Sequence, residues 1–212
     1  METTVHNRES RVSVVSSFPP DMDRGQYSGK IWESLYAMIK NAKHEIKICS
    51  PYFNEAGLNL LLYAFEVAAH NNASIKLLVR LPAGYIPKRC LHAYWRLMQL
   101  FGKNVEIRDF SRHYIQTSQR SFDYPGNAGS VHAKFVIVDS HLLYHGSADL
   151  ADGLTTNFEM GVMIDDPDIV HSFDEHYDYM WKDAGLITPE WVRQHISRRV
   201  VPPRGVEPRF DG

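Results

Sequence analysis

The residues of this chain best suited to chemistry lie close together in its second half. They are His132, Lys134, Asp139, Gly146 and Ser147, in the stretch VHAKFVIVDSHLLYHGSAD, with the spacing H-x-K-x4-D-x6-G-S. A neutral imidazole can attack phosphorus and form a phosphohistidine, which water then resolves. A lysine can neutralise charge on the phosphoryl oxygens, and a serine hydroxyl can donate to one of them. The pattern therefore predicts a phosphodiester site, and this chemistry requires no metal.

A strand followed by a hairpin would bring these residues together. Residues 131–138 alternate as in a strand, so that His132 and Lys134 share one face. The two-residue link 139–140 is typical of a hairpin turn. The returning strand would then place Ser147 beside His132.

A carboxylate follows on the next predicted strand. Glu159 lies twelve residues after Ser147, in NFEMGVMID, and is able to orient the imidazole of His132. Taken singly, each residue has an ordinary structural alternative, such as a solvated lysine or a turn aspartate. Their joint spacing on a strand-turn-strand pattern favours a phosphodiester site over these separate structural roles.

This arrangement resembles the motif of the phospholipase D superfamily, over about residues 28–185. The resemblance implies a catalytic group made of His132, Lys134, Asp139, Ser147 and Glu159. Within it, His132 is the nucleophile or the proton-transfer partner, and Lys134 and Ser147 hold the phosphate. Asp139 is more structural than chemical, and Glu159 pairs with the imidazole.

The sequence departs from the family pattern at one position. The usual G-S-x-N is here G-S-A-D, so Asp149 stands where an asparagine amide normally donates to the phosphate. A carboxylate only accepts hydrogen bonds and repels an anion. Three alternatives remain open: Asp149 is turned away, it pairs with a cation such as Lys134, or the site is weakened. We count Asp149 and Gly146 among the substrate-binding positions.

The number of motifs predicts an oligomer. The chain has 11 histidines, and only His132 is followed by a lysine two positions later. The resemblance implies two such motifs facing each other, because one histidine attacks while the other protonates the leaving oxygen. We therefore expect a homodimer with the site on its two-fold axis, similar to the small single-motif endonucleases.

Composition indicates one α/β domain, a mixed β-sheet flanked by helices on both faces. The chain has 212 residues, of which 44% are hydrophobic and 23% charged. We predict an N-terminal extension over 1–27, the phospholipase D-like domain over 28–185 and a partly disordered tail over 186–212. A net charge of −2 argues against a large non-specific duplex-binding surface, but leaves room for a local basic groove.

Two cysteines, Cys49 and Cys90, lack metal-ligand spacing and are expected to be free core thiols in a reducing compartment. The N-terminus has no apolar signal region, and no run approaches 18 apolar residues. We therefore expect a cytoplasmic protein without a membrane partner.

The long segment before the motif is a candidate substrate-binding loop. Residues 111–130 show no clear period and interleave aromatics with cations, among them Arg112 and Arg120. Such a mixture can stack bases and neutralise the phosphates of a single strand. An ordinary solvated surface loop is an equal alternative. The nearby stretch RLPAGYIPKR, residues 80–89, adds three cations.

These observations predict a phosphodiesterase that cleaves nucleic acid without metal or other cofactor. Two alternatives remain. One is hydrolysis or transfer of a phospholipid head group, which the single motif disfavours. The other is a weak or silent module that binds nucleic acid or a protein partner in a repair, restriction or phage-defence assembly. The sequence does not distinguish DNA from RNA.

Overall fold

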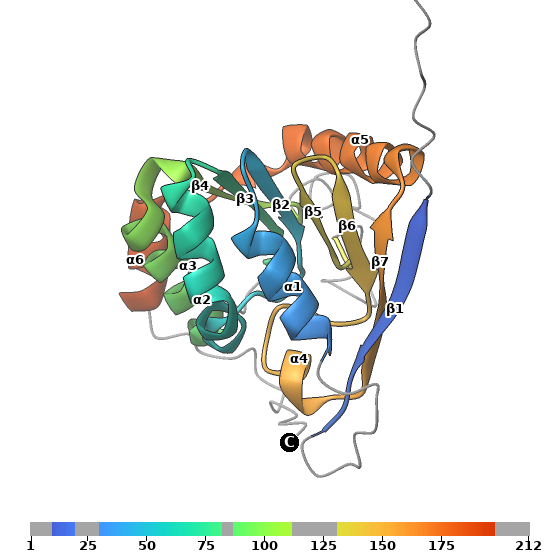
Figure 1. Cartoon of the computed structure of the whole chain (residues 1–212). Helices are drawn as coiled ribbons and strands as arrows, with labels where there is room; N and C mark the ends of the chain where they lie inside the picture. Colours follow the sequence, from blue (N-terminus) through green and yellow to red (C-terminus); the bar gives the residue numbers. More distant parts are fainter. Residues whose placement is uncertain (1–9, 20–29, 82–86, 112–130, 198–212) are drawn as a thin grey trace, which may run out of the picture.

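The computed structural model describes residues 10–19, 30–81, 87–111 and 131–197, which form one sheet covered by helices on both faces (Figure 1). The strands are β1 (Arg11–Ser17), β2 (Glu45–Cys49), β3 (Ser74–Val79), β4 (Val105–Asp109), β5 (Phe135–Val138), β6 (Leu142–Gly146), β7 (Glu159–Asp165) and β8 (Gly185–Leu186). The helices are α1 (Lys30–Lys40), α2 (Glu55–His70), α3 (Lys88–Phe101), α4 (Gly153–Thr156), α5 (Pro167–Asp183) and α6 (Pro189–Ser197).

The sheet is mixed, as predicted. Its strands lie in the order β1-β7-β6-β5-β2-β3-β4-β8. Strands β2, β3 and β4 run parallel to one another. Every other neighbouring pair is antiparallel, including β2 with β5. The carboxyl ends of the parallel strands and the beginning of β5 therefore lie side by side, along the edge of the sheet that is formed by strand ends.

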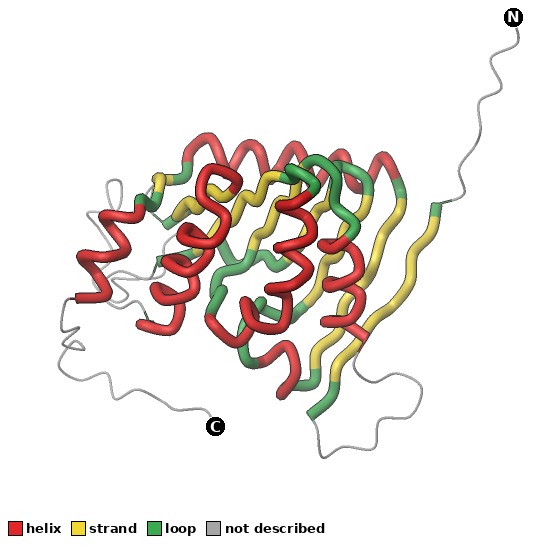
Figure 2. The backbone as a smooth tube through the Cα atoms, turned by 60° about the vertical axis from the view of Figure 1, so that its left-hand side comes forward, coloured by secondary structure: helices red, strands yellow, loops and turns green. Residues whose placement is uncertain are grey.

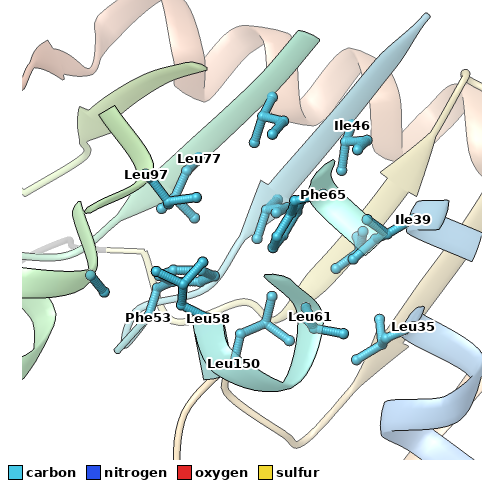
Figure 3. Packing of buried hydrophobic residues seen from close by; sticks show 14 of the residues in the cluster. Leu35, Ile39, Ile46, Phe53, Leu58, Leu61, Phe65, Leu77, Leu97 and Leu150 are labelled. Carbon is cyan, nitrogen blue, oxygen red and sulfur yellow. The ribbon is translucent and has the colours of Figure 1, made fainter. Parts of the chain in front are cut away.

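Helices α1, α2, α3 and α6 cover one face of the sheet, and α5 crosses the other (Figures 1 and 2). The first face holds the larger core, in which α1, α2 and α3 pack on β2 and β3 (Figure 3). Residues labelled there include Leu35, Ile39, Ile46, Phe65, Leu77 and Leu97. The second core joins Tyr177 and Trp181 of α5 to Phe135 and Ile137 of β5. Both faces are buried, which is usual for parallel strands.

The strand predicted over residues 131–138 is shorter in the structure, and the predicted alternation is confirmed over its four residues, 135–138. Phe135 and Ile137 belong to the core under α5, and Val136 and Val138 belong to the other core. Strand β5 begins only at Phe135, so the four residues before it lie outside the ladder. In this segment Val131 is buried in the second core, whereas His132 and Ala133 are exposed to solvent.

The hairpin between β5 and β6 differs by one residue from the prediction. The register pairs Val138 with Leu142, so three residues form the link instead of two. Asp139 and Ser140 both adopt positive φ angles, 54° and 49°, and the His141 N–H donates to the Val138 carbonyl at 3.0 Å. Two consecutive positive φ angles match the twist of the flanking strands.

The folded part of the chain extends beyond the predicted domain, 28–185, toward both the N-terminus and the C-terminus. Strand β1, from the predicted N-terminal extension, pairs with β7 along Arg11–Ser17 and is the outermost strand of the sheet on that side. Helix α6, from the predicted tail, packs against α3, and the Thr188 hydroxyl accepts the Trp191 N–H at 3.2 Å. Helix α6 was missed because it spans only nine residues. Residues from 198 onward lie outside the described residues.

Candidate active site

Four of the five predicted catalytic residues lie at the ends of adjacent strands on one edge of the sheet. His132 and Lys134 directly precede β5, Ser147 directly follows β6, and Glu159 is the first residue of β7. Strands β5, β6 and β7 are antiparallel neighbours, so the start of β5, the end of β6 and the start of β7 meet. The topology therefore brings together residues that are up to 27 positions apart in sequence.

Lys134 is held at the centre of this edge. Its ammonium donates to the His132 carbonyl at 3.2 Å and lies 3.7 Å from Asp149 Oδ2. The side chain is only 11% exposed. His132 is exposed, and so its imidazole is accessible from solvent. The two residues that the strand pattern placed on one face thus present a cation and an imidazole at the same edge.

Gly146 allows β6 and β7 to approach each other closely. A Cβ atom at this position would lie 2.7 Å from the Met160 carbonyl oxygen and 2.9 Å from the Gly161 Cα. Any larger residue would therefore push β6 and β7 apart. The Gly146 N–H also donates to the Lys134 carbonyl at 3.2 Å, which joins the end of β6 to the segment before β5.

Ser147 and Glu159 are directly connected. The Ser147 hydroxyl donates to Glu159 Oε2, and the same hydroxyl accepts the Met160 N–H at 3.1 Å. Asn157 Nδ2 donates to Glu159 Oε1 at 3.4 Å. Among the described residues, the hydrogen-bond partners of the carboxylate are thus Ser147 and Asn157. The contact between Glu159 and His132 stays a prediction.

Asp149 adopts the second of the three alternatives left open by the sequence, pairing with Lys134. Its Oδ1 accepts the Tyr52 N–H at 3.1 Å and the Ser50 hydroxyl at 3.4 Å, while Oδ2 faces the ammonium. Burial raises the pKa of Asp149, although the Tyr52 N–H and the Lys134 charge act in the opposite direction. Asp149 thus connects Lys134 to the segment that follows β2.

Asp139, which we predicted within the catalytic group, lies apart from its other members. It follows the far end of β5, a four-residue strand, so the strand length of roughly 13 Å separates it from Lys134. Its carboxylate accepts the backbone N–H groups of Lys43, His44 and Glu45 at 2.8, 2.8 and 2.9 Å. Its contacts are therefore structural: they hold the β5–β6 hairpin against the start of β2.

Arg112 and Arg120, the remaining predicted substrate contacts, lie outside the described residues. The binding loop that contains them stays a prediction.

Sequence reasoning missed two residues at this edge as site residues, Ser50 and Tyr52, and included Arg80 only within the cationic stretch 80–89. Ser50 and Tyr52 follow β2, and Arg80 follows β3. The Ser50 hydroxyl accepts the Leu150 N–H at 3.0 Å, and Arg80 Nη2 donates to the Tyr52 hydroxyl at 2.7 Å. The available signal was positional, because ligands commonly bind at the carboxyl ends of parallel strands.

The described residues contain no group of three or more His, Cys, Asp or Glu side chains that could hold a metal ion. Nor does the described part of the chain contain a helix long and apolar enough to cross a membrane. Cys49 and Cys90 are buried free thiols, as predicted, and burial raises the pKa of each to about 12.

Comparison with known proteins identifies the family. A family model described as cardiolipin synthase, PLD-like domain, matches residues 35–181, which include the whole candidate site. The chain belongs to the phospholipase D superfamily. The family and the fold that we inferred from His132, Lys134 and Ser147 are thus both confirmed.

Individual relatives of this phospholipase D superfamily chain differ in their described roles. Cardiolipin synthase A of Proteus mirabilis is 26% identical over 173 residues, which cover 81% of this chain but 32% of that protein. The chain thus spans about a third of the length of this curated relative. Nuc from Salmonella typhimurium, a phospholipase D family member, has a TM-score of 0.59 at 20% identity, covering 84% of this chain and 99% of Nuc. TrmBL2, an archaeal chromatin protein with a novel mode of DNA binding, has a TM-score of 0.51 at 17% identity, covering 88% of this chain and 57% of TrmBL2.

Proposed function

We propose that this chain is a metal-independent phosphodiesterase that cleaves nucleic acid through a phosphohistidine intermediate. The observation that carries the proposal is the convergence of His132, Lys134 and Ser147 at one edge of the sheet. This edge offers a nucleophile, a cation and a hydroxyl donor for one phosphodiester. Family membership supports phosphodiester chemistry of this general type.

The residues have distinct roles in the first step. An unprotonated imidazole nitrogen of His132 attacks phosphorus, so that a P–N bond forms and the P–O bond to the leaving nucleoside breaks. The Lys134 ammonium stabilises charge on the non-bridging oxygens, and the Ser147 hydroxyl donates to one of them. Because Ser147 now donates to Glu159, this hydroxyl must exchange partners when the phosphate binds.

A second imidazole completes the cycle. It protonates the leaving oxygen in the first step and then, as a neutral base, takes a proton from the water that breaks the P–N bond. The 212 residues contain one H-x-K motif, so we propose that His132 of a second copy supplies this group. The active site is then shared across the two-fold axis of a homodimer.

Nucleic acid is the favoured substrate because further cations surround the site. Arg80 directly follows β3, and Lys88 and Arg89 begin α3, the next helix, so these cations lie toward the carboxyl end of β3, where a polyanionic strand can lie. The DNA binding described for TrmBL2 is compatible with this choice. Phosphatidyl transfer is the second candidate, and the cardiolipin synthase description of the matching family model favours it.

The decisive experiment measures cleavage of labelled single- and double-stranded DNA and RNA in EDTA, and of phosphatidylglycerol in detergent micelles. Parent protein is compared with His132→Ala. We expect nucleic-acid cleavage that survives chelation and falls at least a thousandfold in the variant, because the nucleophile is lost. His141→Ala is the matched control, since His141 lies in the hairpin at the other end of β5.

Other outcomes point to the alternatives. Release of glycerol or formation of a new phosphatidyl ester, without nucleic-acid cleavage, would establish the lipid activity instead. Tight nucleic-acid binding without cleavage of any substrate would support the silent module of a repair, restriction or phage-defence assembly. Loss of cleavage in EDTA, with recovery on adding a divalent metal, would contradict the metal-independent mechanism.

A further inference from the structure

Three cations lie on this side of the sheet, Lys134 before β5, Arg80 after β3 and Arg89 in the first turn of α3, and two of them are already paired with carboxylates. Lys134 faces Asp149 at 3.7 Å, and Arg89 Nη1 contacts Asp152 Oδ2 at 2.5 Å. Arg80 differs, because its contacts in the described part of the chain are with a neutral side chain, that of Tyr52.

Among the described residues, the side-chain partner of the Arg80 guanidinium is Tyr52, which carries no negative charge. Arg80 Nη2 donates to the Tyr52 hydroxyl at 2.7 Å, and the guanidinium carbon lies 5.1 Å from the centre of the Tyr52 ring. Its Nε is covered from solvent and has no hydrogen-bond partner in the part of the chain that the structure describes. An unpaired donor of this kind is costly, and a nearby anion would reduce the cost of the confined charge. Arg80 remains partly exposed, which leaves the guanidinium open to a ligand.

Tyr52 connects this arginine to the phosphodiester site. The Tyr52 N–H donates to Asp149 Oδ1, and the other oxygen of that carboxylate faces Lys134. The Arg80 N–H also donates to the Pro51 carbonyl at 3.4 Å, which holds together the segments that follow β2 and β3. A continuous series of contacts thus runs from Lys134 through Asp149 and Tyr52 to Arg80, along the edge formed by the strand ends.

We propose that Arg80, positioned by Tyr52, forms a second anion subsite that binds the phosphate adjacent to the scissile phosphodiester on a nucleic-acid strand. The proposal rests on the proposed function and extends it, because it specifies a substrate with at least two consecutive phosphates. A planar guanidinium suits phosphate through its paired N–H donors. A substrate with one phosphate would use Lys134 and leave Arg80 without an anion.

The test measures binding of a fluorescent single-stranded oligonucleotide by the full chain carrying His132→Ala, so that the strand is not cut. Arg80→Gln should raise the Kd about tenfold and lower the slope of log Kd against log salt by about 0.7, the value for one phosphate contact on a single strand. Arg96→Gln is the matched control, because Arg96 lies on α3 and also bonds a neutral side chain, that of Asn59. Arg80→Lys should keep most of the salt slope, which tests the subsite if Arg80→Gln fails to fold.

A second measurement separates this proposal from the proposed function. Bis(4-nitrophenyl) phosphate has one phosphate, so Arg80→Gln should reduce kcat/KM on an oligonucleotide about tenfold more than on this ester. An equal loss of kcat/KM on the oligonucleotide and on the ester, or an unchanged salt slope of oligonucleotide binding, would overturn the subsite. Weaker binding to phosphatidylglycerol vesicles, with unchanged oligonucleotide binding, would also overturn it. If the parent cuts neither substrate but Arg80→Gln still lowers the salt slope, the subsite stands and the catalytic proposal fails.

Discussion

In the proposed mechanism, Lys134 is the residue whose charge acts most directly on the phosphate, and its ammonium lies between Asp149 and the backbone of His132. The carboxylate of Asp149 competes with a bound phosphate for this charge. An asparagine at the same position would keep an oxygen to accept the Tyr52 N–H, but would carry no negative charge. The Asp149–Lys134 pair therefore moderates the affinity of the site for anions.

Asp149→Asn should increase kcat/KM on bis(4-nitrophenyl) phosphate by about fivefold at pH 7. Two opposite charges about 4 Å apart interact by ~1 kcal/mol in water, and the substitution removes that competition. Because the pKa of Asp149 is raised, the parent should approach the variant as pH falls through that pKa and the carboxyl becomes neutral. Asp152→Asn is the control, since Asp152 faces Arg89 instead of Lys134. A lower kcat/KM in the Asp149 variant would show that the carboxylate assists the reaction.

At the scale of elements, the β5–β6 hairpin positions the site from its far end. Asp139 accepts three backbone N–H groups from the segment between α1 and β2. Partial burial acts to raise the pKa of Asp139, but the three donors outweigh it, and the pKa is lowered. The register of β5 on β2, and with it the place of His132 and Lys134, therefore depends on a residue outside the site.

Asp139→Asn should lower the free energy of unfolding by about 1.5–3 kcal/mol at pH 7, the range for hydrogen bonds to a charged group. A lowered pKa means that this stability is present above the unfolded-state value of 3.8 and is lost as pH falls through the folded-state value. Urea unfolding at pH 7 and pH 3 measures both effects. Glu66→Gln, on the exposed face of α2, controls for the loss of one carboxylate. An equal difference at both pH values would contradict the ionised role of Asp139.

At the scale of the whole molecule, one sheet edge collects the chemistry, whereas two cores hold the sheet in place. The parallel strands β2 and β3 direct their carboxyl ends toward this edge, and the antiparallel strand β5 begins there. The net charge of −2 therefore does not argue against nucleic acid at this edge, because the relevant cations are gathered locally.

Subunit mixing tests whether the site is shared between two copies. Parent and His132→Ala chains are co-refolded in varied ratios, and phosphodiesterase activity is measured at constant total protein. If both imidazoles are required, activity should follow the square of the parent fraction, because only parent–parent pairs are complete. At an equal mixture, about one quarter of the activity should remain. A linear dependence would show that each chain acts alone.

The sequence by itself determined the family and the fold class, and it predicted that His132, Lys134, Ser147 and Glu159 come together, as they do at one edge of the sheet. Local patterns were sufficient because strand alternation and turn residues are short-range properties, and the motif spans two adjacent strands. The pairing of β1 with β7 was not predicted, because an edge pairing between distant segments is a long-range property.

Only the tertiary structure decided the partners of the charged side chains. The pairing of Asp149 with Lys134, the bonds from Ser147 to Glu159 and the placement of Arg80 on Tyr52 each join different strand ends. Such contacts depend on strand order and register, which follow from packing the two cores. Asp139 shows the same limit: its spacing within the motif was recognisable, but only the length and direction of β5 place it at the far end of the sheet.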